Sequence, residues 1–112
     1  LELSHFRGAL VENYVIIECM KNSSNQNREQ AFYYWRDNKG IEVDLIIDDG
    51  ATFLPVEIKS AETYSADFIK NLKKIKSYSG VKEAVIVYDG KMEFETSDGI
   101  QVINWSSFLK NY

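Results

Sequence analysis

Residues 41–60 read IEVDLIIDDGATFLPVEIKS, and this stretch decides the fold that we expect for the chain. Apolar residues alternate with polar or charged ones on either side of Asp49-Gly50, a dipeptide typical of a tight hairpin turn. The pattern predicts two antiparallel strands that share one aliphatic face, formed by Ile41, Val43, Leu45, Ile47, Leu54, Val56 and Ile58. The charged residues of the hairpin fall on its opposite face.

The register of this hairpin determines which charged residues meet. A register that is symmetric about the turn brings Asp44 opposite Glu57, and it brings Glu42 opposite Lys59. A β-bulge would shift these pairs. Two carboxylates directly opposite each other destabilise a hairpin, whereas a bound divalent cation would turn their repulsion into ligation.

The composition predicts one globular domain that spans residues 1–112. Of the 112 residues, 45% are hydrophobic, which is typical of a chain with a single core. No apolar run approaches the roughly 20 residues of a membrane span, and no signal peptide is recognisable, so we expect a cytoplasmic protein without a membrane segment. Cys19 is the only cysteine, which excludes an internal disulfide and is compatible with a reducing compartment.

The remaining patterns predict an α/β fold. Helical spacing and capping residues predict helices over residues 4–20, with Ser4 as cap, over 66–79, with Ser65 as cap, and from Asn104 or Ser106 onward. Further strands are predicted at residues 32–36, 83–89, 92–95 and 100–103. The strand at 83–89, EAVIVYD, is a nearly continuous apolar run, which indicates burial on both faces and is compatible with a parallel neighbour. Residues 21–30 are polar and predict a surface loop.

Two features of the predicted helices have more than one interpretation. Glu12 lies among apolar residues of the first helix. It is either a partly exposed carboxylate at the rim of the apolar stripe or a third acid beside the sheet, and the helix by itself favours the first interpretation. The helix at 66–79 carries four lysines, Lys70, Lys73, Lys74 and Lys76. A solvated face is the favoured interpretation for these lysines, and contact with a phosphate backbone comes second.

The charged face of the hairpin has the donors that metal-assisted phosphodiester cleavage requires. Asp44 and Glu57 offer carboxylate oxygens for Mg²⁺ or Mn²⁺, and the carbonyl of Ile58 offers another oxygen. Lys59, two residues after Glu57 on the same side of the strand, can stabilise hydroxide or phosphate charge. Glu12 could add a fourth oxygen source. Without a metal, Glu42 and Lys59 would form an ordinary cross-strand ion pair, and Asp44 would be a solubility charge at the edge of the strand.

Other chemistries fit the sequence less well. His5 is the only histidine, so a Ser-His-Asp triad or a histidine-rich zinc site is not supported, and an exposed position on the first helical turn is expected. Cys19 on an apolar helix stripe indicates a core residue rather than a nucleophile. Residues 33–35, YYW, could stack on bases, but packing is the more frequent role of aromatic strand residues.

The order Glu12, Asp44 and Glu57-Ile58-Lys59 resembles the PD-(D/E)XK nuclease superfamily. More narrowly, four segments are similar to the C-terminal domain of unknown function of prokaryotic AAA+ ATPase-like proteins. They are GALVEN at 8–13, YWR at 34–36, GIEVD at 40–44 and EIKS at 57–60. The resemblance covers residues 6–60 well and the rest only in pattern.

The resemblance implies a restriction-endonuclease-like αβββαβ core with a central mixed sheet flanked by helices. It implies that Asp44 and Glu57 are metal ligands, that Lys59 is the catalytic lysine and that Glu12 is an auxiliary acid. It also implies a longer protein, whose N-terminal ATPase domain would bind ATP through a P-loop. The chain departs from the superfamily pattern at Val43, where a proline would stand, and Ser60 is shorter than the polar residue of some members.

We therefore expect a Mg²⁺- or Mn²⁺-dependent nuclease-like domain that acts on DNA and serves a larger ATPase. The alternative is a DNA- or protein-binding regulatory module that keeps the fold without cleavage, and the formal net charge of −4 favours it, because autonomous DNA binders are usually basic. A third possibility is a docking domain whose acidic face contacts the ATPase.

Overall fold

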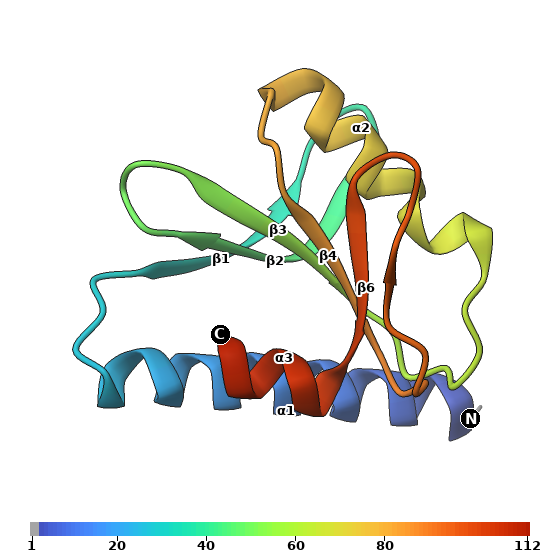
Figure 1. Cartoon of the computed structure of the whole chain (residues 1–112), viewed down its shortest axis with the longest axis horizontal. Coiled ribbons are helices and arrows are strands. Elements are labelled where there is room, and N and C mark those ends of the chain that lie inside the picture. The colour runs from blue at the N-terminus through green and yellow to red at the C-terminus, as the bar shows by residue number, and fades with distance from the viewer. Residues whose placement is uncertain (1–2) are drawn as a thin grey trace.

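The computed structural model describes residues 3–112, which form three α-helices, one 3-10 helix and a six-stranded sheet (Figure 1). In chain order the elements are α1 (Leu3–Asn25), β1 (Ala31–Arg36), β2 (Glu42–Asp48), β3 (Phe53–Ile58), η1 (Ala66–Ile69), α2 (Lys70–Ser79), β4 (Ala84–Tyr88), β5 (Phe94–Glu95), β6 (Ile100–Asn104) and α3 (Trp105–Asn111). This succession confirms the predicted α/β class and the αβββαβ order.

The sheet is mixed, with strand order β1-β2-β3-β4-β6-β5. The first three strands form the predicted antiparallel meander, while β4 lies parallel to both β3 and β6. Every residue of β4 is buried, as its unbroken apolar run predicts. The strand predicted at residues 100–103 is confirmed as β6. It lies inside the sheet, between β4 and β5, and its Ile100 and Val102 are fully buried.

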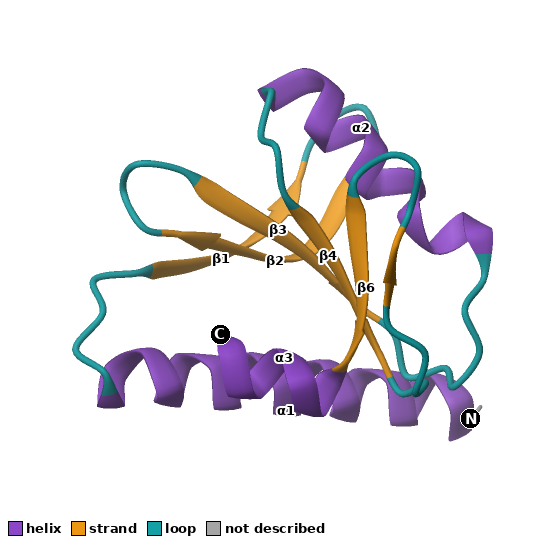
Figure 2. Cartoon of the chain, viewed as in Figure 1, coloured by secondary structure: helices purple, strands orange, loops and turns teal. Residues whose placement is uncertain are grey.

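Helices cover both faces of the sheet, α2 on one side and α1 with α3 on the other (Figure 2). An apolar cluster lies between the sheet and its helices on each face. The α2 cluster includes Ile46, Leu72 and Ile86. The α1 cluster includes Val15 of α1, Val56 and Phe108 of α3. No helix of the described residues is long and apolar enough to cross a membrane.

The β2–β3 hairpin has the predicted register, but β2 contains a bulge that the pattern did not predict. The pairs from Leu45–Val56 to Asp48–Phe53 are those expected. Between Tyr33 and Trp35, however, β1 advances by two residues while β2 advances by three. Asp44 and Leu45 therefore lie against one residue of β1. The bulge corrects the predicted aliphatic face, because Val43 joins the α2 cluster and Leu45 joins the α1 cluster.

Helix α1 is longer than predicted and less buried. It continues to Asn25 instead of ending near Met20, which corrects the loop expected over residues 21–30. Two tertiary hydrogen bonds explain the extension: Asn22 Nδ2 donates to Leu109 O, and the buried Ser23 hydroxyl donates to Gln30 Oε1. Of the predicted apolar stripe, Leu10, Tyr14 and Ile17 are about half exposed. The side chains of Ser4 and His5 lie outside the described residues.

The other helix ends follow their sequence signals in part. Ser65 precedes η1 at the predicted capping position. Its hydroxyl donates a hydrogen bond to the Asp67 carboxylate, however, and accepts none from a backbone amide of the helix. Gly80 ends α2 in the left-handed conformation, with φ of 75°, as predicted. Asn104 caps α3 by accepting a hydrogen bond from the Ser106 amide.

Candidate functional site at the open end of the β2–β3 hairpin

The β2–β3 ladder stops at the pair Leu45–Val56, which leaves the first three residues of β2 and the last two of β3 unpaired with each other, and two carboxylates occupy this opening. Asp44 Oδ2 accepts a hydrogen bond from the Ile58 amide at 2.8 Å. Glu57 Oε1 accepts one from the Asp44 amide at 3.0 Å. Each side chain thus satisfies a backbone donor that the ladder leaves free, which fixes both carboxylates in place. The bulge at Asp44–Leu45 explains why the β2–β3 ladder ends here, since a bulge bends its strand and disturbs backbone pairing.

The carbonyl of Ile58 faces the same opening. In extended backbone the amide and carbonyl of one residue point to the same neighbouring strand, and the Ile58 amide points to Asp44. The next amide, that of Lys59, turns the other way and donates to Val87 O of β4 at 2.8 Å. Two carboxylates and one carbonyl therefore converge at the end of the hairpin.

Lys59 places its ammonium group beside Glu57. Its Nζ lies 3.5 Å from Glu57 Oε2 and 5.5 Å from the centre of the Phe68 ring in η1. The side chain of Lys59 is about one-third exposed, whereas that of Glu57 is 7% exposed. The lysine therefore borders the opening, with one side turned to solvent and the other to a buried carboxylate.

Helix α1 brings Glu12 to this group. The carboxyl of Glu12 shares a hydrogen bond with Asp44, and this bond raises the pKa of Glu12 and lowers that of Asp44. Glu12 is half-buried, which agrees with a partly exposed carboxylate at the rim, and it lies near Asp44, which agrees with a third acid beside the sheet. One turn earlier, Gly8 faces Ser60, and a Cβ there would lie 3.9 Å from the Ser60 hydroxyl.

The pKa values of all three carboxyls are raised, for the same main reason. Burial raises the pKa of Glu57 from 4.5 to about 7, and the negative charge of Asp44 adds to this effect. Burial also raises the pKa of Asp44, against the opposing hydrogen bond from the Ile58 amide. The pKa of Glu12 is raised mainly by burial and secondly by repulsion from the charge of Asp44. The attraction of Lys59 opposes every one of these shifts, and it is too weak to cancel them.

Glu42 lies outside this group, which corrects its predicted pairing. No ion pair joins Glu42 to Lys59 in the described part of the chain; Glu42 pairs with Arg36 of β1 at 3.5 Å, and after burial the charge of Glu42 is the next cause that raises the pKa of the Tyr34 phenol on the same strand. The ladder has already opened at this position, so the predicted opposite residues diverge. The sequence analysis did not predict that Tyr34 and Arg36 of β1 lie beside Glu42. Their signal was the alternation of Tyr34 and Arg36 on one face of β1.

The donor set defines what the site can hold. Within residues whose side chains are described, no three His, Cys, Asp or Glu side chains form a metal-holding group. The set of Asp44, Glu57 and the Ile58 carbonyl is nevertheless composed of hard oxygen donors, the type that Mg²⁺ and Mn²⁺ prefer. Mg²⁺ is commonly held by one or two carboxylates with water completing its coordination, so this smaller set fits such an ion.

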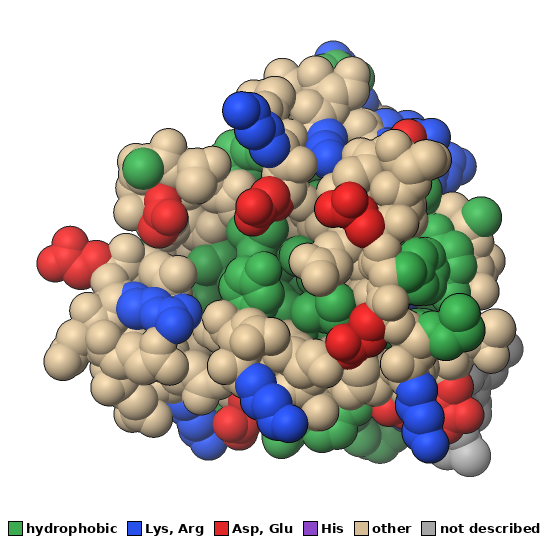
Figure 3. All heavy atoms as spheres, viewed as in Figure 1, with side chains coloured by type: hydrophobic (Ala, Val, Ile, Leu, Met, Phe, Trp, Pro, Cys, Tyr) green, Lys and Arg blue, Asp and Glu red, His purple; other side chains and the backbone are tan. Residues whose placement is uncertain are grey.

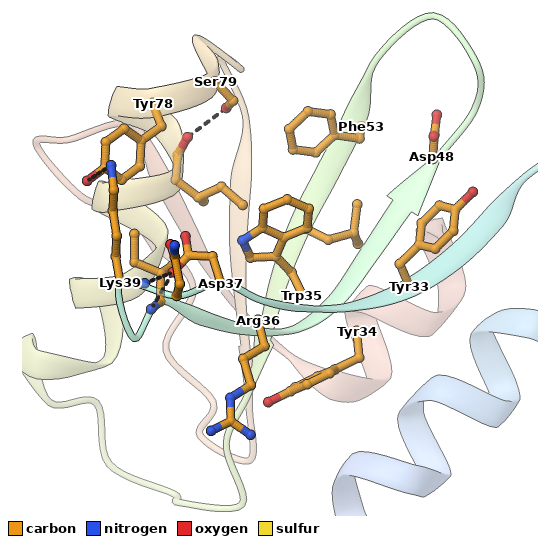
Figure 4. A pocket seen from close by; sticks show the side chains of 14 residues that line it. Tyr33, Tyr34, Trp35, Arg36, Asp37, Lys39, Asp48, Phe53, Tyr78 and Ser79 are labelled. Carbon is orange, nitrogen blue, oxygen red and sulfur yellow. Dashed lines mark hydrogen bonds between the residues drawn. The ribbon is translucent and has the colours of Figure 1, made fainter.

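A separate hollow of about 830 Å³ lies on the α2 side of the sheet, away from the carboxylates. Its walls are aromatic, with Tyr33, Trp35, Phe53 and Tyr78 around it (Figure 4). Lys39 lies over the ring of Tyr78, 4.5 Å from its centre. The hollow contains none of the residues predicted for catalysis.

Comparison with known proteins identifies the family. A family model described as Domain of unknown function (DUF4143) matches residues 7–108, which is nearly the whole chain and includes all four residues of the site. No curated protein matches the chain. The chain therefore belongs to the family described as Domain of unknown function (DUF4143).

Proposed function

We propose that this domain hydrolyses phosphodiester bonds of DNA with the help of Mg²⁺ or Mn²⁺. The observation that supports the proposal most is the reciprocal anchoring of Asp44 and Glu57 by each other's strands, with Lys59 3.5 Å from Glu57. The arrangement of Asp44, Glu57 and Lys59 at the end of a hairpin resembles the site of PD-(D/E)XK nucleases. The αβββαβ order agrees with that resemblance.

The electrostatics of the site support a cation. Asp44 and Glu57 each use one oxygen for a backbone amide; among the described residues the second oxygen of Asp44 accepts no backbone hydrogen bond, and that of Glu57 lies 3.5 Å from the Lys59 ammonium. Burial raises the pKa of both carboxyls, and the charge of Asp44 raises the pKa of Glu57 further, which means that two negative charges are unfavourable here without a compensating charge. A divalent ion held by these oxygens and the Ile58 carbonyl would polarise a phosphate and acidify a water.

The remaining two residues have roles that follow from their positions. Lys59 presents a positive charge at the rim, where it can stabilise charge that develops on a phosphate. Its ion pair with Glu57 keeps the ammonium at the site. Glu12 shares a hydrogen bond with Asp44, so it holds that carboxylate from the α1 side and can hold or release a proton there.

The cellular setting that we propose rests on the resemblance alone. A domain similar to the C-terminal part of AAA+ ATPase-like proteins would act beside an N-terminal ATPase, which would bind ATP and set where the nuclease-like domain meets DNA. Such an arrangement would compensate for weak DNA binding by an acidic domain with a net charge of −4.

The test is cleavage of supercoiled plasmid and of single-stranded DNA in Mn²⁺. Wild type is compared with Asp44→Asn and Lys59→Ala, and with Glu42→Gln as the matched control, since Glu42 is an exposed acid of the same strand. We expect the first two variants to lose at least about 10²-fold in rate, the scale of a lost charge-stabilising group, and the control to retain activity. Equal rates in all four proteins would refute the assignment.

A second candidate is a regulatory module that keeps the fold without cleaving DNA. It is favoured by the lysines of α2, two of which have structural partners: Lys73 pairs with Asp98, and Lys76 donates to the carbonyls of Lys82 and Asp98. On the face shown in Figure 3, basic side chains are dispersed among acidic ones. This candidate predicts neither Mn²⁺-dependent cleavage nor Mn²⁺ binding that depends on Glu57.

A further inference from the structure

Strand β1 is an unusual edge of the sheet. It lies at one end of the strand order and pairs only with β2, whereas the opposite edge, β5, is two residues long. Three consecutive side chains of β1 are aromatic and about half exposed: Tyr33 at 51%, Tyr34 at 56% and Trp35 at 44%. Exposed, apolar edge strands of this length are sites at which another strand pairs.

The backbone of β1 is suited to such pairing. The extra residue of the bulge lies in β2, so β1 itself remains regular along its free side. Every second residue of β1 turns its amide and carbonyl away from β2. The sequence AFYYWR contains none of the usual protections of an edge, since it has neither proline nor lysine, and its one charge is on Arg36 at its end.

The side chains of β1 form a self-complementary pattern. Tyr33 and Trp35 share one face and line the aromatic hollow, while Tyr34 points to the other face (Figure 4). If β1 is paired antiparallel with itself about Tyr34, each Tyr33 falls opposite a Trp35 and each Phe32 opposite an Arg36. Aromatic pairs in these positions are favourable, a guanidinium beside a ring is attractive, and no like charges meet.

We propose that β1 is a homodimer interface, in which β1 of two copies of this chain pair antiparallel around a twofold axis at Tyr34. The two sheets then become one continuous sheet, and the aromatic hollows of the two copies meet across the axis. An isologous contact of this kind closes on itself and leaves no free β1 edge. The dimer dissociates on dilution, because the contact consists of one strand and its flanking side chains.

The test begins with sedimentation velocity over a wide range of protein concentrations, in EDTA so that metal binding plays no part. We expect a concentration-dependent dimer for wild type. Tyr34→Lys places two like charges opposite each other at the axis and should abolish the dimer, as should Tyr34→Glu, whereas an equimolar mixture of the two variants should restore it. Met92→Lys is the control, because Met92 is 73% exposed and lies between β4 and β5, outside the aromatic hollow and away from the β1 edge.

A second measurement is independent of these charges. Residues facing each other across a twofold axis between antiparallel strands lie at a separation that a disulfide can span, so Tyr34→Cys should cross-link on mild oxidation and Met92→Cys, exposed but far from the β1 edge, should not. The natural Cys19 is 1% exposed and does not interfere. A wild type that stays monomeric at millimolar concentration, a dimer that survives Tyr34→Lys, or a mixture of variants that stays monomeric would each overturn the proposal.

Discussion

Glu57→Gln should stabilise the protein in the absence of divalent metal, and the gain should depend on pH. The side chain of Glu57 is 7% exposed, and burial raises its pKa from 4.5 to about 7. A raised pKa means that the folded protein binds the proton more tightly than the unfolded chain does. Stability therefore falls as pH rises from the unfolded to the folded pKa. Glutamine keeps an oxygen for the Asp44 amide and carries no charge.

The pKa values set the size of this effect. One pKa unit corresponds to about 1.4 kcal/mol, so a shift from 4.5 to about 7 corresponds to about 3 kcal/mol. That difference is fully present above the folded pKa and absent below the unfolded pKa, where both side chains are neutral. Above pH about 7 the glutamine variant should thus be more stable by about 3 kcal/mol, and the two proteins should converge below pH about 4.5.

Urea denaturation in EDTA at several pH values measures this difference. The matched control is Glu42→Gln, because the Glu42 side chain is 52% exposed and its surface ion pair with Arg36 is worth about 1 kcal/mol or less. Adding Mn²⁺ should then stabilise wild type and not the glutamine variant. A glutamine variant no more stable than wild type above pH about 7 would refute the reasoning, since it would mean that Lys59 fully compensates the buried charge.

Three further substitutions test the scaffold around the site, each by urea denaturation. Gly90→Ala should destabilise by about 1–3 kcal/mol, because a Cβ at Gly90 would collide with the Tyr88 ring and the Glu62 carbonyl; a neutral result would show that this turn relaxes freely. Asn104→Ala should cost about 1–2 kcal/mol through loss of the α3 cap and of the hydrogen bond that Asn104 Nδ2 donates to the Gly90 carbonyl, and Asn104→Ser, which keeps a capping oxygen, should cost less. Phe108→Ala should cost about 3–5 kcal/mol, because the ring is fully buried between α3 and the sheet. A cost under about 1 kcal/mol would contradict the packing described.

The hairpin register was predictable because alternation and a turn signal specify it jointly. Asp44 and Glu57 therefore meet where expected. The bulge was not predictable from the hairpin, because it appears only in the pairing of β2 with β1. Alternation alone predicted Val43 and Leu45 on the same face of the sheet. The extra residue of the β2 bulge places them on opposite faces.

The remaining differences have tertiary causes. The polar end of α1 has no helical periodicity, and hydrogen bonds to Gln30 and Leu109 keep it helical. Strand β6 is five residues long, so its pattern could not show that it lies parallel to β4 inside the sheet. Glu12 was ambiguous for the same reason, since only the packing of α1 places it beside Asp44.

The most direct test of the proposed site is a calorimetric titration of the protein with Mn²⁺ at neutral pH. Wild type should bind one ion with release of protons, because the pKa of Glu57 is raised to about 7 and the metal displaces the proton that this carboxyl holds. Asp44→Asn and Glu57→Gln should each abolish the binding heat, and Glu42→Gln should leave it unchanged. Binding that persists in both site variants, or no binding by wild type, would contradict a metal-dependent function at this hairpin.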